Sequence, residues 1–398
     1  MCPNIFGKQK IKGGIIKGDL VNVEKEAVER LRNWHDGKRA SPLHIDIEPT
    51  SSCNLGCRFC WTRSEERVKN CQYQRTLTNE RLIGIIHEAA RLGVKEWEIA
   101  GGWEPMSKPQ TVFKMMTLIK KYGMFGSITT NGILFTRNMI KKLVEIGWDR
   151  ILFSLEGPDA ETHDYLTRVK GSFAKETKNI RLFKEWKEKL GKKRPLYSTH
   201  SVLTNKNYNK LEEMIELGKE LGCEGVNFEP LMIWSEEGEK LKLNKKRREE
   251  LKIHIEKAFK RAKELGICTN VANLREEKLV NKKDMRKIIK DEMSRGEKNI
   301  LSSPCLSPWL NMEIRVSGRV TACRICNDET GCENILDKSL EEIWFGNYFE
   351  NVRKKFMDKN LPDYCKDCAS GLVVDMRNLK NQLTKEVKPL EWAKRRVF

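Results

Sequence analysis

Residues 44–60 read HIDIEPTSSCNLGCRFC and place a cysteine-rich loop directly after an apolar-alternating segment. The alternation over Leu43–Glu48 is typical of a β-strand. Cys53, Cys57 and Cys60 follow this segment on a single loop. Three crowded thiolates can bind three irons of a cubic iron–sulfur cluster, which leaves the fourth iron without a protein ligand. An open position of this kind is what a catalytic metal site requires.

Downstream of this loop, strand and helix patterns alternate. The expected strands are Trp97–Ala100, Gly126–Thr130, Arg150–Leu155, Leu196–Val202 and Gly225–Glu229. The expected amphipathic helices are Val21–His35, Asn79–Leu92, Pro109–Lys121, Arg137–Ile146, Ala174–Leu190 and Tyr208–Leu221. This alternation predicts an α/β fold, a partial (β/α)6 parallel barrel covered by helices. Ligands of parallel sheets bind beyond the carboxyl ends of the strands, where the motifs below fall.

Changes in composition divide the chain into five expected parts. They are an N-terminal extension (1–40), the barrel core (41–235), a charged helical linker (236–300), a small α+β cysteine-rich domain (301–372), and a C-terminal helix with a basic tail (373–398). No strand pattern is visible between Lys240 and Lys298. The cysteine-rich domain is expected to contain a hairpin, Met312–Val316 and Arg319–Ala322, around a Ser-Gly turn.

Composition narrows the class of protein. No stretch of about 18 apolar residues could span a bilayer, and the polar N-terminus does not resemble a secretory signal, so a cytoplasmic protein is expected. Thirteen cysteines then indicate metal binding rather than disulfides. The net charge of +19 could attract nucleic acid, but much of the excess lies in Lys240–Asn299. A solvated, charge-laced helical surface is the favoured interpretation there.

The spacing Cys53-x3-Cys57-x2-Cys60, with Phe59 before the last cysteine, resembles the signature of the radical S-adenosylmethionine superfamily. The resemblance implies a catalytic [4Fe-4S] cluster, S-adenosylmethionine chelated to the open iron, and a 5′-deoxyadenosyl radical that abstracts a substrate hydrogen. It also implies anaerobic chemistry and a low-potential electron donor such as ferredoxin or flavodoxin. A structural zinc site with Cys71 as fourth ligand is the alternative.

Glycine-rich and polar loops after the next strands extend the resemblance. Gly101-Gly102-Trp103-Glu104-Pro105 is similar to the family's Gly-Gly-Glu-Pro element, which binds the methionyl amine, although Trp103 interrupts the usual pattern. Glycines allow close backbone approach, and a carboxylate accepts from an ammonium group. Asn131, in Thr130-Asn131-Gly132, matches a recurrent family loop.

Later loops supply the remaining expected cofactor contacts. Ser154-Leu155-Glu156-Gly157-Pro158 resembles a family element that contacts the ribose or the methionyl group, with Glu156 in place of the commoner Asp. The resemblance implies that Arg168 pairs with the methionyl carboxylate, as a planar guanidinium suits, and that Asn205 is a further contact.

A second cysteine cluster lies near the C-terminus. Its pattern resembles the twitch form of the SPASM extension, which implies an auxiliary [4Fe-4S] cluster held by Cys305, Cys323, Cys365 and Cys368. A zinc ribbon is the alternative, because Cys323-x2-Cys326 and Cys365-x2-Cys368 form two suitable knuckles. Cys326 and Cys332 stay unassigned, and one of them could displace a ligand or bind part of a second cluster.

The sequence therefore predicts a radical enzyme that acts on a peptide, a protein side chain or a small biosynthetic intermediate. Only about 40 residues precede the first strand, too few for a leader-peptide-binding domain, which disfavours a peptide. One alternative is radical modification of RNA through Lys245–Arg248 and Lys282–Lys290. The other is a non-catalytic iron–sulfur or zinc protein that carries electrons or binds a partner.

Overall fold

The computed structural model describes residues 16–63, 76–275, 303–324 and 331–362, together with residues 300, 326, 365, 379, 380 and 383. The chain divides into two compact units. Of the described residues, unit 1 contains 48–63, 76 and 98–275, and unit 2 contains 16–47, 77–97 and those from residue 300 onward. The division falls within strand β2 (Glu96–Ile99).

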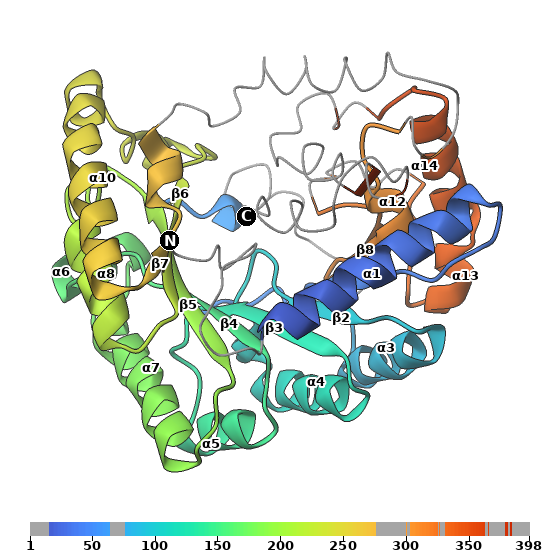
Figure 1. Cartoon of the computed structure of the whole chain (residues 1–398), viewed down its shortest axis with the longest axis horizontal. Helices are drawn as coiled ribbons and strands as arrows, with labels where there is room; N and C mark the ends of the chain where they lie inside the picture. The colour runs from blue at the N-terminus through green and yellow to red at the C-terminus, as the bar shows by residue number, and fades with distance from the viewer. Residues whose placement is uncertain are drawn as a thin grey trace. The chain divides into compact units, whose positions relative to one another are not determined.

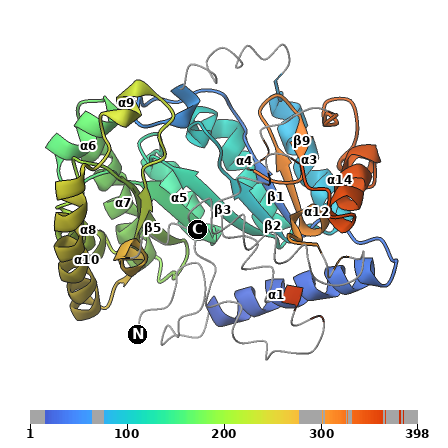
Figure 2. The ribbon, with the colours of Figure 1, turned by 90° about the horizontal axis from the view of Figure 1, so that it is seen from above.

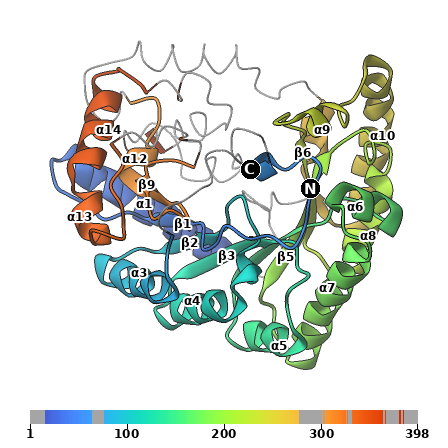
Figure 3. The same ribbon diagram turned by 180° about the vertical axis from the view of Figure 1, so that it is seen from behind.

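Unit 1 is built on a parallel sheet. Its strands, in spatial order, are β3 (Phe125–Thr130), β4 (Arg150–Ser154), β5 (Leu196–Leu203), β6 (Gly225–Pro230) and β7 (Cys268–Thr269). Its helices are α4 (Pro109–Lys121), α5 (Arg137–Glu145), α6 (Ala160–Thr167), α7 (Ser172–Lys189), α8 (Leu211–Glu220), α9 (Glu236–Glu239) and α10 (Lys245–Leu265). Helices α4, α5, α7 and α8 cover one face of this sheet (Figure 1), and α10 lies along α8 (Figure 3). Short 3-10 helices are η1 (Trp61–Arg63), η2 (Pro105–Ser107) and η3 (Val271–Arg275).

Aromatic side chains fill the layer between this sheet and helix α7. The ring of Phe153 lies 5.8 Å from that of Phe183 on α7 and 6.1 Å from that of Tyr197. All three side chains are buried, and large aromatic rings contribute much of the apolar area that stabilises such a layer. Gly126 on β3 leaves room for Trp148, because an added Cβ would lie 2.1 Å from the indole.

Unit 2 contains residues 16–47 and the described part of the cysteine-rich region. Its elements are α1 (Ile16–His35), β1 (His44–Ile47), α3 (Asn79–Leu92), α12 (Ser307–Leu310), β8 (Asn311–Ile314), β9 (Val320–Thr321), α13 (Leu340–Trp344) and α14 (Asn347–Met357). Strand β1 pairs in parallel with β8, and β8 pairs antiparallel with β9 (Figure 2). Gly318 makes the hairpin turn with a φ of +82°, a conformation that glycine adopts without strain. Trp344 at the end of α13 donates to the Ala40 carbonyl at 2.7 Å.

The structure confirms the predicted α/β class, with a mostly parallel sheet and helices, and the predicted hairpin. Two expectations need correction. The charged linker does contain a strand, β7, which pairs with β6 through Gly225 and Cys268; two residues are too few to show alternation. Helix α6, which Asp159 caps, was also not expected, because its eight residues carry little apolar periodicity.

Candidate active site

The cysteine loop of unit 1 is held by backbone hydrogen bonds to the end of helix α6. Gly56 N donates to Thr167 O at 3.0 Å, and Arg58 N donates to Leu166 O at 2.9 Å. Both donors lie between the first and last cysteines of the loop. These two bonds fix the middle of the cysteine loop relative to helix α6.

The thiol of Cys57 lies in an electronegative environment. Burial raises the pKa of Cys57 well above its ordinary value, and the charges of Glu156, Cys60 and Cys53 raise it further. A thiol in such a place keeps its proton until a cationic group binds, since metal binding releases the proton. The environment therefore fits a positively charged iron–sulfur core.

The arrangement does not suit a single zinc ion. Zinc–sulfur bonds of about 2.3 Å hold any two sulfurs within roughly 4.6 Å of each other. Among the residues that the structure describes, no three cysteine sulfurs lie within 4.8 Å of one another. A cubic cluster binds each thiolate through a different iron and accepts a wider spacing. Cys71, the alternative fourth zinc ligand, lies outside the described residues.

The two glycines of residues 101–105 allow this segment to approach the chain on either side of the cysteines. Gly101 has a φ of +134°, and an added Cβ would lie 2.5 Å from Glu48 Cγ. A Cβ on Gly102 would lie 2.3 Å from Thr62 Cγ2. Thr62 Oγ1 in turn lies 3.0 Å from Cys60 Sγ. Larger residues at either position would displace the segment that carries the cysteines.

Glu104 is buried and ties the glycine loop to the end of strand β3. Its Oε1 accepts from Met106 N at 2.9 Å and from Thr130 Oγ1 at 2.7 Å, and its Oε2 accepts from Asn131 N at 2.7 Å. Burial raises its pKa, and these hydrogen bonds only partly offset the rise. A carboxylate has about four acceptor positions, so three internal bonds leave one for an ammonium group.

Asn131 connects strand β3 directly to the cysteine loop. Its Nδ2 donates to Asn54 Oδ1 at 2.8 Å, and Asn54 lies between Cys53 and Cys57. Its Oδ1 accepts from Ile133 N at 3.1 Å. The side chain that was predicted to contact the cofactor therefore also positions the cluster-binding loop.

Glu156 is buried at the end of the loop that follows strand β4. Its Oε2 accepts from Val202 N on β5 at 2.8 Å, and its backbone N donates to His163 Nδ1 at 3.2 Å. Burial raises the pKa of Glu156 to about 7, with a partial offset from the charge of His200. The longer side chain, where the family pattern has Asp, thus reaches the neighbouring strand and braces this loop.

The sheet face opposite the helices is polar. Tyr197 on β5 packs on the helix side with Phe153, so the alternation of the strand places His200 on the other face. His200 is in register with Ser154 on β4, and its Nε2 lies 3.2 Å from Glu229 Oε2 on β6. A parallel sheet with two buried apolar faces carries almost continuous hydrophobic residues. The polar row of Ser154, His200 and Glu229 therefore marks a face without an apolar covering layer.

Glu176 on helix α7 was missed by the sequence-based prediction. Its side chain is fully buried, and neither carboxylate oxygen has a hydrogen-bond partner among the described residues. Its Oε2 lies 3.5 Å from His163 Nε2. Burial raises its pKa well above the ordinary value, and the charges of Glu156 and Glu104 add to the effect. The sequence feature that could have indicated its burial is its position four residues before Ile180, on the apolar face of the helix.

Arg168 and Asn205 contact the α9 segment. Arg168 Nη2 donates to Glu237 Oε2 at 2.9 Å, and the same oxygen accepts from Arg58 Nη1 at 2.9 Å. Asn205 Nδ2 donates to Lys240 O at 2.7 Å. The structure thus brings Arg168 to the cysteine loop through the shared Glu237, whereas Asn205 holds the chain beyond α9.

Three of the four predicted auxiliary ligands, Cys305, Cys323 and Cys365, are described in unit 2, and Cys368 lies outside the described residues. Cys305 precedes α12, where Ser307 N donates to its Sγ at 3.4 Å. Cys323 follows strand β9. The hairpin between them fixes the positions of these two cysteines.

Tyr348 places the two unassigned cysteines in the same region. Burial raises its pKa above the ordinary value, and the charges of Cys326 and Cys332 raise it further, with a hydrogen bond to Cys332. Its hydroxyl accepts from Ala322 N at 3.4 Å. Both cysteines therefore lie near the segment that carries Cys323, which keeps them as candidate cluster ligands.

Several cations in the described part of the charged stretch are paired with carboxylates. On helix α10, Lys252 lies 2.6 Å from Glu249, and Arg261 lies 2.7 Å from Glu216 on α8. Lys282–Lys290 lies outside the described residues. Paired charges of this kind are typical of a solvated helix surface. In the described part of the chain, every helix is too short or too polar to cross a lipid bilayer.

Comparison with protein-family models gives two matches. Residues 47–218 match the radical SAM superfamily, and residues 305–369 match SPASM, an iron–sulfur cluster-binding domain. The chain belongs to the radical SAM superfamily and carries a SPASM domain, and it is an enzyme. The first domain binds a [4Fe-4S] cluster and S-adenosylmethionine, and the second binds auxiliary iron–sulfur clusters.

Individual relatives are distant. The chain is 22% identical to the PqqA peptide cyclase of Rhizobium meliloti, over 82% of this chain and 79% of that protein. It is 30% identical to the AdoMet-dependent heme synthase of Methanosarcina barkeri, but the match spans only about half of each chain, 46% and 49%. Streptococcus suis SuiB bound to S-adenosylmethionine shares the fold, with a TM-score of 0.58 at 18% identity, over 89% of this chain and 78% of SuiB.

Proposed function

We propose that this enzyme directs radical chemistry at a peptide or protein substrate. The observation that carries the proposal is the cysteine loop, which Asn131 and the end of α6 hold at the strand ends of unit 1. When bound there, the cluster and S-adenosylmethionine would supply a 5′-deoxyadenosyl radical that abstracts a substrate hydrogen.

The comparisons support the choice of substrate class. One relative is named for cyclising the PqqA peptide, and SuiB has been solved with its precursor peptide SuiA. Both are similar to this chain over most of its length. They favour a peptide over the other substrate classes. Small biosynthetic intermediates are the runner-up, because the match to the heme synthase covers only 46% of this chain.

In this proposal, different residues of unit 1 bind the cluster and S-adenosylmethionine. Cys53, Cys57 and Cys60 hold the catalytic cluster. The glycine loop admits the methionyl end, where Glu104 has one acceptor position left for the amine. The polar row of β4 to β6 then faces the space in which a substrate is oriented.

Unit 2 would hold the auxiliary cluster through Cys305, Cys323, Cys365 and Cys368. Four thiolates leave no open iron, so this cluster would accept an electron from the substrate or shape its pocket. We place the reaction in the cytoplasm under anaerobic conditions, with ferredoxin or flavodoxin as the electron donor.

Isotope transfer tests the substrate class even while the substrate itself is unidentified. Anaerobically reconstituted enzyme would be incubated with S-adenosylmethionine, a reductant and extract from cells grown on deuterated medium. Deuterium in the 5′-deoxyadenosine shows hydrogen abstraction from an extract component. We expect the label to depend on the peptide and protein fraction and to be lost after protease treatment. Label that survives protease and follows the low-mass fraction would reject a peptide substrate, and loss with ribonuclease would indicate RNA.

A further inference from the structure

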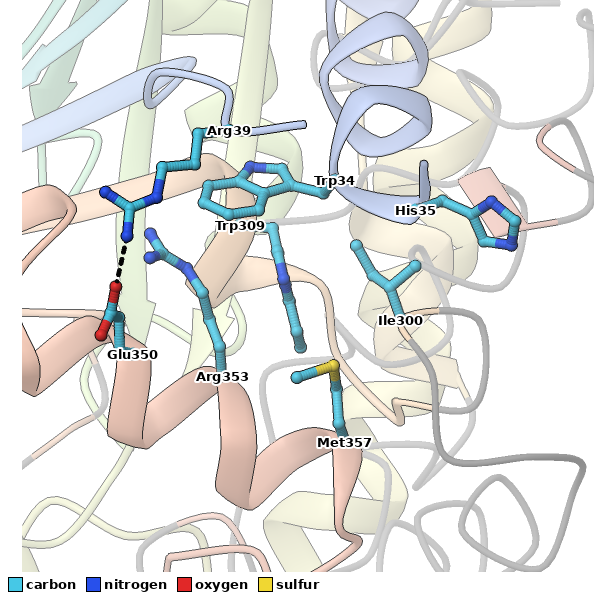
Figure 4. A pocket seen from close by; sticks show the side chains of 8 residues that line it. All are labelled: Trp34, His35, Arg39, Ile300, Trp309, Glu350, Arg353 and Met357. Atoms are coloured by element: carbon cyan, nitrogen blue, oxygen red, sulfur yellow. Dashed lines mark hydrogen bonds and ion pairs between the residues drawn. The ribbon is translucent and has the colours of Figure 1, made fainter. Parts of the chain in front are cut away.

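Unit 2 contains a pocket of about 360 Å³ between helices α1, α12 and α14. Its volume lies in the range of small-molecule sites. Its apolar walls are Trp34, Ile300, Trp309 and Met357, and its polar residues are His35, Arg39, Glu350 and Arg353 (Figure 4). None of the proposed cluster or cofactor ligands lines it. It is therefore a separate feature from the active site.

The guanidinium of Arg353 is buried against aromatic rings. Its Cζ lies 4.4 Å from the ring centre of Trp34 and 4.4 Å from that of Trp344. Arg353 itself is only 4% exposed. Contacts of this kind with aromatic rings stabilise the cation, and its hydrogen bonds are made at the edges of the planar group.

Two of the three guanidinium nitrogens donate hydrogen bonds, and the third does not. Nε donates to Pro308 O at 3.0 Å, and Nη1 donates to Trp344 O at 2.9 Å. Nη2 has no acceptor among the described residues. A buried donor without an acceptor is unfavourable, and more so when it carries charge. The guanidinium therefore has one unused donor, Nη2, which is itself buried, and Arg353 lines a pocket wide enough for a ligand.

The charge of the pocket is unbalanced. Arg39 pairs with Glu350 at 2.8 Å, which leaves Arg353 as the surplus cation of the lining (Figure 4). Burial lowers the pKa of Arg353 to about 9, so the group is still protonated at neutral pH. A ligand with one negative charge would complete the balance, and a carboxylate fits the planar edge of a guanidinium.

We propose that this pocket binds a carboxylate carried on an apolar body, with the carboxylate on Arg353 Nη2 and the body against Trp309 and Met357. The same chemistry is present in a small apolar acid and in the C-terminal residue of a peptide that ends in an aromatic side chain. The site is independent of the proposed peptide chemistry in unit 1.

Calorimetry on the anaerobically reconstituted full chain tests this site. The probes are hydrocinnamate and the peptide Ala-Ala-Phe, each compared with its neutral amide. We expect at least one acid to bind ~10- to 100-fold more tightly than its amide, because a hydrogen bond to a charged group contributes about 1.5–3 kcal/mol. Preference for hydrocinnamate indicates a small acid, and preference for the peptide indicates a chain end.

Replacement of Arg353 would also remove its bonds to Pro308 and Trp344, so Met357→Trp is the cleaner variant. The indole would fill the pocket and abolish binding of the acid, with S-adenosylmethionine cleavage unchanged. Ile253→Trp, on the exposed surface of α10, is the matched control and should bind as the wild type does. Equal affinity for acid and amide, absence of saturable binding, or full affinity in Met357→Trp would overturn the proposal.

Discussion

Glu104 accepts hydrogen bonds from Met106, Thr130 and Asn131 and is buried among them. In Glu104→Gln the amide NH2 would face groups that are themselves donors. We expect a loss of about 1–3 kcal/mol in the free energy of unfolding of the cluster-free protein, because a buried donor is left without an acceptor. Denaturant titration measures it, with Glu213→Gln on the exposed side of α8 as control. Equal stability of Glu104→Gln and wild type would reject this role.

The contact between Asn54 and Asn131 makes a second prediction at the residue scale. Each single change to alanine removes one partner of the 2.8 Å hydrogen bond. In a double-mutant cycle, the two changes should be non-additive by about 0.5–1.5 kcal/mol in the free energy of unfolding. Strictly additive effects would mean that the bond does not join the cysteine loop to β3.

The gathering of Cys53, Cys57 and Cys60 on one loop could be predicted because their spacing is local, and the placement of polar residues at the strand ends because it follows from the fold. Their roles as ligands stay predictions. The partners of side chains could not. Arg168 pairs with Glu237, which is far away in the sequence. Glu176 is buried beside His163 although its residue type is usually exposed.

Whole elements were predicted well where periodicity was long. Alternation defined β3 to β6, and amphipathic patterns defined α3, α4, α5, α7 and α8. The parallel pairing of β1 with β8 was not predictable, because strand pairing depends on contacts between segments that are distant in the chain. It explains why β1 belongs to the same compact unit as the cysteine-rich hairpin.

Strand β1 carries a charge cluster that makes unit 2 sensitive to pH. Burial lowers the pKa of His44, but Asp46 and Glu96 outweigh it and raise the pKa to about 10. Arg324, after strand β9, lies 2.6 Å from Asp46 and helps to hold the pKa of that carboxyl well below its usual range. The hairpin and β1 are thus joined by charge as well as by backbone pairing.

Because the folded pKa of His44 lies above its unfolded value of about 6.5, its stabilisation is complete below that pH and is lost as the pH rises toward 10. We expect the free energy of unfolding to fall by on the order of 3 kcal/mol across this window. Denaturant titrations at several pH values, compared with His44→Gln, isolate this contribution. Parallel profiles for the two proteins would contradict it.

At the scale of the whole molecule, each unit carries its own cysteine set, so the two sets should be separable by mutation. Cys365→Ala is expected to lower the iron content while the reduced enzyme still cleaves S-adenosylmethionine in the absence of substrate. Iron analysis and quantification of 5′-deoxyadenosine check both parts. Loss of cleavage together with auxiliary iron would show that the catalytic loop depends on unit 2.

The most direct measurement is formation of 5′-deoxyadenosine by the oxygen-protected, reconstituted chain after reduction in the presence of S-adenosylmethionine. If Cys53, Cys57 and Cys60 hold a cluster with an open iron, the wild type forms 5′-deoxyadenosine and Cys57→Ala forms none. A wild type that carries zinc on this loop, or that binds iron and yet yields no 5′-deoxyadenosine, would contradict the account.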